Sequence, residues 1–149
     1  MDYNFEQFYY IRDNKICSTG KPESKPFACI CLRGYHDFGE SGWKFARGVA
    51  ICSPKDRFTK AVGRKKASAV LEDKTEKIAR AFSPELLDSL VRIGEADNGV
   101  KLILPNSNPK IASRGMLTFV CNSHYKKAAF GLSRKDLSRF EKDLVKHLP

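Results

Sequence analysis

The stretch "FARGVAICSPKDRFTKAVGRKK", Phe45–Lys66, joins an apolar run directly to a strongly basic segment and decides the fold that we expect. Its first eight residues are typical of a buried strand. Ser53 suits a helix N-cap, Pro54 suits the first helical position, and Asp56 stands where a capping box places its acid. We therefore predict a strand over Phe45–Cys52 and a helix that begins at Ser53.

Two earlier apolar runs, Phe8–Ile16 and Phe27–Leu32, are bounded by Gly, Pro, Ser and Asp clusters and also predict strands. Together with Phe45–Cys52 they are expected to form an antiparallel meander. Between the last two lies "GYHDFGESGW", Gly34–Trp43, whose glycines favour a long hairpin loop. Aromatic residues in such a loop are candidates to touch a ligand.

The basic helix is expected to run to about Phe82. Ser83, Pro84 and Glu85 repeat the start signal for a second helix, which should end at Gly94. Further strands are predicted over 100–104, 116–121 and 125–132, the last of them pairing back on the one before it. Ser133 and Asp136 make another capping box ahead of a terminal helix. Its sheet-facing side is expected to carry Leu137, Phe140, Leu144 and Leu148.

Length and composition suit one folded unit. The chain has 149 residues, of which 42% are hydrophobic, and its 27 Lys and Arg residues against 17 Asp and Glu residues give a formal net charge of +10. We find no internal repeat or linker. The sequence predicts a single α+β domain over residues 1–149, an antiparallel sheet with packed helices. The charge favours an anionic partner.

The sequence also indicates a compartment. No apolar run approaches the roughly 18 residues that a membrane-spanning helix needs, and the first ten residues have no leader pattern. The five cysteines are odd in number, and most lie in apolar contexts, which fits free thiols in a reducing environment. We expect a cytoplasmic protein without a membrane partner.

A helical wheel separates the basic helix into two faces. An apolar face, expected to pack on the core, holds Phe58, Ala61, Val62 and Ala69. A cationic face, a candidate phosphate site, holds Arg57, Lys60 and Arg64. Lys65 falls on the apolar side, and Gly63, costly inside a helix, indicates a close approach of another backbone or a ligand. The alternative is that the charge only keeps the surface solvated.

Patterns for metal binding or catalysis are missing. The cysteines and the three histidines lack the spacing of a zinc site, and no nucleophile, base or nucleotide-binding loop motif is present. The sequence therefore predicts no cofactor, no metal and no enzyme. Phosphate would have to be held by side chains, with Arg supplying forked donors and Lys a point charge.

The segment Ala46–Ala67 resembles small phage-encoded accessory proteins: an apolar strand, then Cys-Ser-Pro-x-Asp-x-Phe, then Gly-Arg four residues on. Among such proteins are anti-defence sponges, which bind and hide nucleotide immune signals without cleaving them. The resemblance implies a non-catalytic protein that captures a nucleotide in the cytoplasm of an infected bacterium. Such a sponge is expected to be a small homo-oligomer.

Three functions follow from these observations. The first is capture of a phosphate-bearing nucleotide, with a stacking role for Phe38 or another loop aromatic; its candidate site residues are Arg47, Arg57, Lys60, Arg64, Tyr35 and Trp43. Trp43 would otherwise be a core anchor. The second is nucleic-acid binding along the basic helix, extended by a second basic patch of Lys110, Arg114, Lys126 and Lys127. The third is an inhibitor that docks on an acidic surface of a host immune protein.

Overall fold

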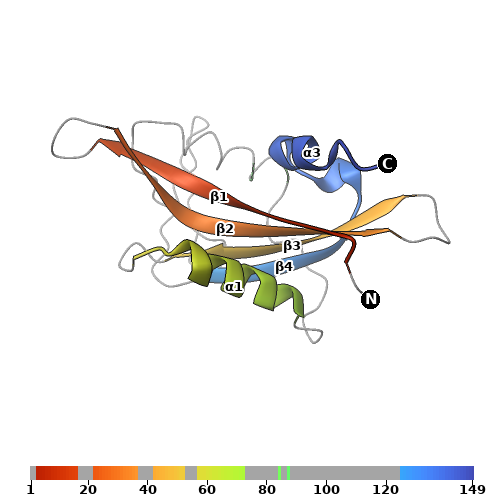
Figure 1. Cartoon of the computed structure of the whole chain (residues 1–149), viewed down its shortest axis with the longest axis horizontal. Helices are drawn as coiled ribbons and strands as arrows, with labels where there is room; N and C mark the ends of the chain where they lie inside the picture. Colours follow the sequence, from red (N-terminus) through yellow and green to blue (C-terminus); the bar gives the residue numbers. More distant parts are fainter. Residues whose placement is uncertain are drawn as a thin grey trace, which may run out of the picture.

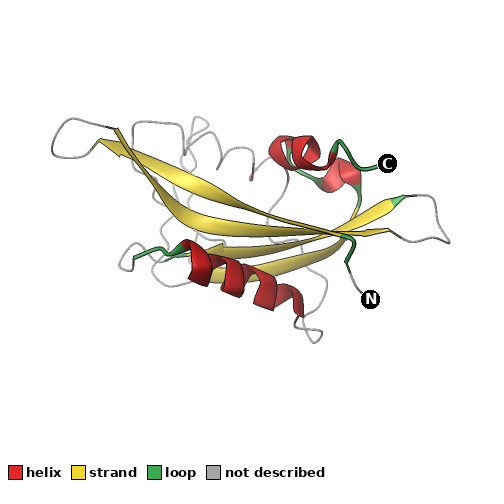
Figure 2. Ribbon diagram, in the orientation of Figure 1, coloured by secondary structure: helices red, strands yellow, loops and turns green. Residues whose placement is uncertain are grey.

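The computed structural model describes residues 3–16, 22–36, 42–52, 57–72, 84, 87 and 125–149. Within them lies an antiparallel sheet in the order β1-β2-β3-β4 (Figure 1), made of Phe5–Ile16, Pro22–His36, Trp43–Ile51 and Tyr125–Leu132. The helical elements that accompany it are α1, α3 and the short 3₁₀ turn η2, over Lys60–Glu72, Arg139–Val145 and Arg134–Asp136. The predicted α+β fold is confirmed (Figure 2).

The meander of the first three strands is confirmed, with longer strands than the sequence indicated. β1 and β2 pair from Phe5 opposite Gly34 to Ile16 opposite Pro22. Their register shifts between Ile11 and Arg12, next to Pro26, because a proline nitrogen has no hydrogen to give to the ladder. β2 continues to His36, so the first three residues of the predicted Gly34–Trp43 loop belong to a strand.

The strand predicted over Tyr125–Leu132 is confirmed as β4, and it pairs with β3. Its predicted partner Met116–Cys121 lies outside the described residues, as do the strand predicted over 100–104 and most of the helix predicted over 83–94. Of that helix, Pro84 and Leu87 are described and helical, and Leu87 is fully buried.

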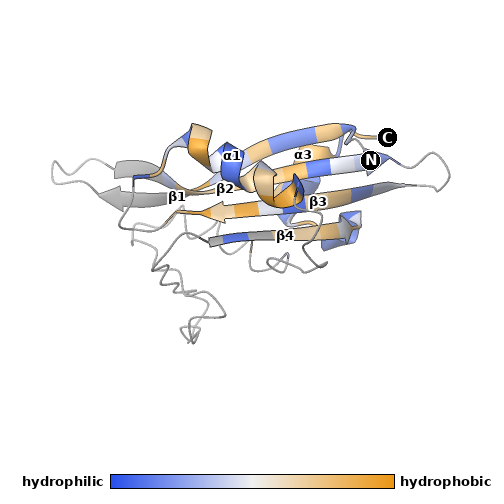
Figure 3. Cartoon of the chain, turned by 90° about the horizontal axis from the view of Figure 1, so that it is seen from below, coloured by the Kyte–Doolittle hydropathy of each residue, from blue (hydrophilic) through white to orange (hydrophobic). Residues whose placement is uncertain are grey.

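Alternation along the strands sends side chains to two opposite faces, one covered by α1 and the other by α3. The α1 side is built from small and sulfur-containing residues, among them Cys29, Cys31, Ala46 and Ala128. The α3 side is bulkier, with Leu32, Phe45 and Leu137. Figure 3 looks onto the α1 side, where α1 carries both hydrophilic and hydrophobic residues.

Two glycines let α1 approach the sheet closely. A Cβ on Gly48 of β3 would overlap the Ala67 carbonyl oxygen of α1. A Cβ on Gly63 of α1 would lie 3.0 Å from Cys29 Cβ and 2.9 Å from Phe58 Cζ. The close approach expected at Gly63 is therefore present, and its partners are the sheet and the residues just before the helix.

The predicted start and faces of the basic helix are wrong in two respects. Arg57, Phe58 and Thr59 are not helical and α1 begins at Lys60, so the helical wheel started at residues that precede the helix. The residues expected to start it, Ser53, Pro54 and Asp56, lie outside the described part of the chain. The buried face consists of Gly63, Ala67, Val70 and Leu71. Ala61, Val62, Lys65 and Ala69 are exposed, because the two glycine contacts set which side of α1 meets the sheet.

The predicted capping box of Ser133 and Asp136 is confirmed at η2. The terminal helix α3 begins only after a second capping box, formed by Ser138 and Glu141. Its buried residues are Glu141 and Val145, whereas Phe140, predicted to face the sheet, is 38% exposed. Among the described residues, no helix combines the length and apolar character needed to span a bilayer.

Candidate functional site

A small pocket, partly open to solvent, lies where α1 begins beside the ends of β3 and β4. It is lined by three kinds of residue: cations, apolar side chains and a single hydroxyl. The lining residues are Ala50, Ile51, Cys52, Arg57, Phe58, Thr59, Val62, Gly63, Lys66 and Lys126. We call it the α1 pocket.

The three cations of the α1 pocket come from three separate segments. Arg57 precedes α1, Lys66 lies in the second turn of α1, and Lys126 is on β4 opposite Ala50 of β3. Arg57 and Lys126 are exposed and Lys66 is half-buried. None of the described lining residues is acidic. The arrangement concentrates positive potential over one small concave surface, which favours a multiply charged anion.

Most of the remaining lining residues are apolar. Ala50 is 5% exposed and faces α1, and Gly63 is buried against the sheet. The Phe58 ring lies beside Gly63 and edge-on to Tyr10, with ring centroids 6.1 Å apart. Val62 is 48% exposed although it is apolar, so a hydrophobic side chain stands at the surface next to the cations. Such a surface can take a ligand that is partly apolar and partly anionic.

A second cationic group lies over Tyr10 and is separate from the α1 pocket. Lys60 Nζ is 5.0 Å from the centre of the Tyr10 ring, and Arg64 donates a hydrogen bond to the Tyr10 hydroxyl at 2.8 Å. Neither Lys60 nor Arg64 lines the pocket. The expectation that Arg57, Lys60 and Arg64 share one helical face is therefore wrong, because Arg57 precedes the helix.

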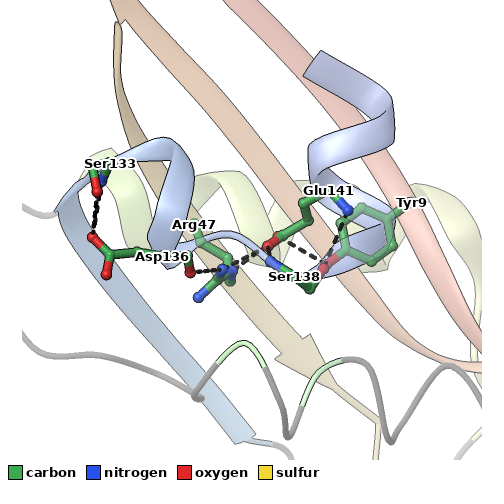
Figure 4. A network of polar contacts seen from close by, with 6 residues as sticks. All are labelled: Tyr9, Arg47, Ser133, Asp136, Ser138 and Glu141. Atoms are coloured by element: carbon green, nitrogen blue, oxygen red, sulfur yellow. Dashed lines mark hydrogen bonds and ion pairs between the residues drawn. The ribbon is translucent and has the colours of Figure 1, made fainter. Parts of the chain in front are cut away.

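Arg47, predicted to bind phosphate, is fully buried on the α3 side of the sheet. Its Nε donates to Glu141 Oε2 at 2.9 Å, and its Nη2 donates to Glu141 Oε1 at 2.5 Å (Figure 4). Glu141 also accepts from the Tyr9 hydroxyl and from the Ser138 backbone N–H, both at 2.9 Å. Arg47 belongs to this core network, and we remove it from the phosphate-binding set.

The two aromatic candidates lie on opposite faces of the sheet, and neither lines the α1 pocket. Tyr35 is half-buried and packs on the α1 side, where burial raises the pKa of its hydroxyl and Arg33 opposes that shift. Trp43 packs on the α3 side, stacked on Phe45 with centroids 6.3 Å apart and edge-on to His36 at 5.2 Å. Both side chains are placed as core components, and Phe38 lies outside the described residues.

The second basic patch is only partly described. Lys110 and Arg114 lie outside the described residues. Lys127, on β4, pairs with Val49 of β3, and its side chain likewise lies outside the described part. Lys126 is the member of this patch that joins the α1 pocket. Register explains its position, because Lys126 and Ala128 are two residues apart on β4 and so face the same side of the sheet.

Sequence reasoning missed several pocket residues. Lys66 was placed beside the cationic stripe and Val62 was assigned to the core, whereas Phe58 packs against the core as predicted and also lines the pocket. The sequence does indicate that Lys66 lies next to Val62, because residues four apart are neighbours on the surface of an α-helix. Whether Cys52 and Thr59 line the pocket depends on where α1 begins, which the sequence did not predict correctly.

Two acidic residues, Glu6 and Glu72, meet near the far end of α1. Arg33, 6% exposed, donates to Glu6 at 2.7 Å and to Glu72 at 2.5 Å. Burial disfavours the charged guanidinium, but these two hydrogen bonds outweigh it and raise the pKa of Arg33. Glu72 is the only acid of α1 and its last residue. Among the residues that the structure describes, the charged side chains at the end of α1 that borders the pocket are all basic.

The buried thiols of Cys29 and Cys31 lie on β2, on the side of the sheet that α1 covers. Burial raises the pKa of Cys29 and of Cys31 from 9.0 to about 12, and Glu6 adds to the shift at Cys31. Both thiols are buried, whereas the Cys52 thiol is partly exposed. Within the described part of the chain, no group of three or more His, Cys, Asp or Glu side chains is arranged to hold a metal ion.

Comparisons of the chain with known protein families, with curated proteins and with solved structures gave no match. The α1 pocket is therefore the feature from which we infer a function.

Proposed function

We propose that this protein binds a small phosphate-bearing nucleotide in the α1 pocket and holds it without chemical change. The observation that carries the proposal is the convergence of Arg57, Lys66 and Lys126 on a pocket whose described lining is otherwise mainly apolar and contains no acid. Arginine offers forked donors to phosphate and lysine offers a mobile point charge, so the set suits a group with several anionic oxygens.

The electrostatics of α1 support an anionic ligand. Its first turn contains no acid, and its first seven residues contain four cations, Lys60, Arg64, Lys65 and Lys66. Because the first turn of a helix carries a partial positive charge, Lys60 is unfavourable there, and Lys60 and Arg64 are like charges four residues apart that repel each other. A chain that keeps a locally unfavourable pattern often does so at a functional site. A bound phosphate would relieve the repulsion.

The resemblance of Ala46–Ala67 to phage accessory proteins extends the proposal. On that basis the ligand would be a nucleotide immune signal of a bacterial host, and the function would be its sequestration. Retention alone would suffice, because a signal held at high affinity cannot reach its effector.

Two neighbouring lysines provide a matched test. Lys66 lines the pocket and Lys65, exposed on the same helix, does not. We would titrate the wild type, Lys66→Gln and Lys65→Gln with 5′-nucleoside monophosphates and cyclic dinucleotides by isothermal calorimetry. Loss of one phosphate contact should weaken binding about tenfold, or roughly 1.4 kcal/mol, in Lys66→Gln and by less than about twofold in Lys65→Gln. Equal losses in both variants, or no binding by the wild type, would overturn the proposal.

A second candidate is binding of DNA or RNA along α1. It is favoured by the presence of cations on both sides of the helix, with Lys60 and Arg64 over Tyr10 and Lys66 at the pocket. Nucleic acid would contact both groups, whereas a small nucleotide would need only the pocket. A duplex-shift assay at two salt concentrations decides between them, because contacts spread over many phosphates give a steep salt dependence.

A further inference from the structure

Resting on the proposed function, we infer that the α1 pocket binds the terminal phosphate group of its ligand and leaves the remainder of the molecule outside. The ligand class is then a phosphate monoester, such as a 5′-nucleoside monophosphate. A phosphate that links two groups, as in a cyclic nucleotide or a cyclic dinucleotide, is a diester and fits the pocket less well. Size, charge and the placement of the polar groups each favour the monoester.

The size of the α1 pocket limits what can enter it. Its volume is about 30 Å³. A site needs about 10–15 Å³ to hold one water molecule, so this pocket has room for roughly two, which is enough for the oxygens at one end of a phosphate group. A base or a sugar is too large. A diester has a substituent on each side of its phosphorus atom, whereas a monoester has only one, which can point out to solvent.

The charge of the described lining also favours a monoester. The lining contains three cations, Arg57, Lys66 and Lys126, and no acid. A phosphate monoester carries a charge of about −1.5 to −2 near neutral pH, whereas a diester carries a charge of about −1. Because Coulomb attraction scales with the product of the charges, three cations around one small space attract the monoester more strongly.

The polar groups of the lining are positioned by the fold itself. The Thr59 carbonyl accepts a hydrogen bond from the Gly63 N–H at 2.9 Å, which fixes Thr59 and its hydroxyl at the first turn of α1. Lys126 pairs with Ala50 of β3, and both residues line the pocket. Lys66 is half-buried, so its stem packs on the protein and restricts where its charge can lie. Donors fixed on separate segments suit the several oxygens at the free end of a monoester.

The test compares 5′-AMP with 3′,5′-cyclic AMP, which has the same base and sugar but holds its phosphate as a diester. Calorimetry of the wild type should give binding of 5′-AMP at least about tenfold tighter, equivalent to roughly 1.4 kcal/mol. Lys126→Gln removes a cation of the lining and should reduce this preference to about threefold, because the more highly charged ligand loses more attraction. Lys44→Gln, at an exposed position of β3 outside the lining, is the matched control and should keep the preference.

The outcomes separate this inference from the proposed function. Equal affinity for the two ligands, or equal effects of Lys126→Gln and Lys44→Gln on the preference, would overturn the terminal-phosphate site. Nucleotide capture would still stand if Lys66→Gln weakened both ligands. Ribose 5-phosphate, which has a terminal phosphate and no base, should bind more tightly than 3′,5′-cyclic AMP. If it bound as tightly as 5′-AMP, the terminal-phosphate site would stand and the proposed preference for a nucleotide would fall. Binding of none of these ligands would overturn both proposals together.

Discussion

The Arg47 guanidinium and the Glu141 carboxylate form a two-pronged ion pair at full burial, and this pair fastens α3 to β3. Glu141 lies at the third position of α3 and caps the helix through the Ser138 backbone N–H. One carboxylate therefore caps the start of α3, pairs with the buried Arg47 and accepts a hydrogen bond from the Tyr9 hydroxyl (Figure 4).

Replacing Arg47 by methionine should destabilise the protein strongly. The change leaves Glu141 as a buried charge without its cation, and breaking such a pair costs about 3–5 kcal/mol. Urea denaturation measures the change in the free energy of unfolding. Lys44→Met, at an exposed position of the same strand, is the control and should change it by less than about 0.5 kcal/mol. A loss below about 1 kcal/mol in Arg47→Met would contradict the role assigned to the pair.

Arg47 also shows what a sequence cannot decide. The strand around it was predicted correctly from its apolar run, but the partner that buries it is 94 residues away. No local pattern distinguishes an arginine paired in the core from one that waits for phosphate. The meander and the cap at Ser133 were predictable because each depends on neighbours in the chain.

Gly48→Ala should lower stability more than Gly63→Ala. The new methyl group at Gly48 would meet the Ala67 backbone carbonyl, which cannot move without shifting α1, and overpacking of this kind costs about 1–3 kcal/mol. At Gly63 the nearest atom belongs to the Phe58 ring, which can turn, and alanine gains roughly 1 kcal/mol of helix propensity over glycine. Thermal melts of the two variants check the order, and a reversed order would refute the close packing of α1 on β3.

Alkaline pH should destabilise the protein through its buried acids. Burial raises the pKa of Cys29 and Cys31 from 9.0 to about 12 and raises the pKa of Tyr9 well above its ordinary value. The folded state therefore keeps protons that the unfolded chain releases. This contribution to stability is complete below about pH 9 and is lost as the pH rises toward 12. Urea unfolding between pH 8 and 11 measures the decline. The double variant Cys29→Ala, Cys31→Ala should show a shallower decline, and an unchanged slope would contradict burial of the two thiols.

Cys52 should react with iodoacetamide faster than Cys29 or Cys31. Cys52 is partly exposed and lines the α1 pocket, whereas the other two are buried with a raised pKa. Peptide mass spectrometry identifies the labelled residue, with Cys17→Ser and Cys121→Ser simplifying the pattern. A nucleotide in the pocket should slow labelling of Cys52. Unchanged labelling at saturating 5′-AMP would mean that the nucleotide binds elsewhere.

The candidate site was harder to predict than the fold, because it is assembled from three segments. Lys126 reaches the pocket through the pairing of β4 with β3, and Arg57 through the late start of α1. A basic stripe on one ideal helix was the simplest interpretation of the charges around residue 60. The cations can be found in the sequence, but the packing of the elements determines which of them line the pocket and which lie beside Tyr10.

Arg57→Ala and Arg64→Ala should therefore have different effects on ligand binding. Arg57 lines the pocket, and its loss should weaken binding of 5′-AMP about tenfold, the effect of one charge-assisted contact of roughly 1.4 kcal/mol. Arg64 donates to the Tyr10 hydroxyl at an exposed position outside the pocket, so its loss should change affinity less than twofold. Both side chains are exposed and both variants should melt near the wild-type temperature. If Arg64→Ala weakened 5′-AMP as much as Arg57→Ala did, the ligand would span both cationic groups, and an extended phosphate chain or nucleic acid would replace the single nucleotide as the preferred partner.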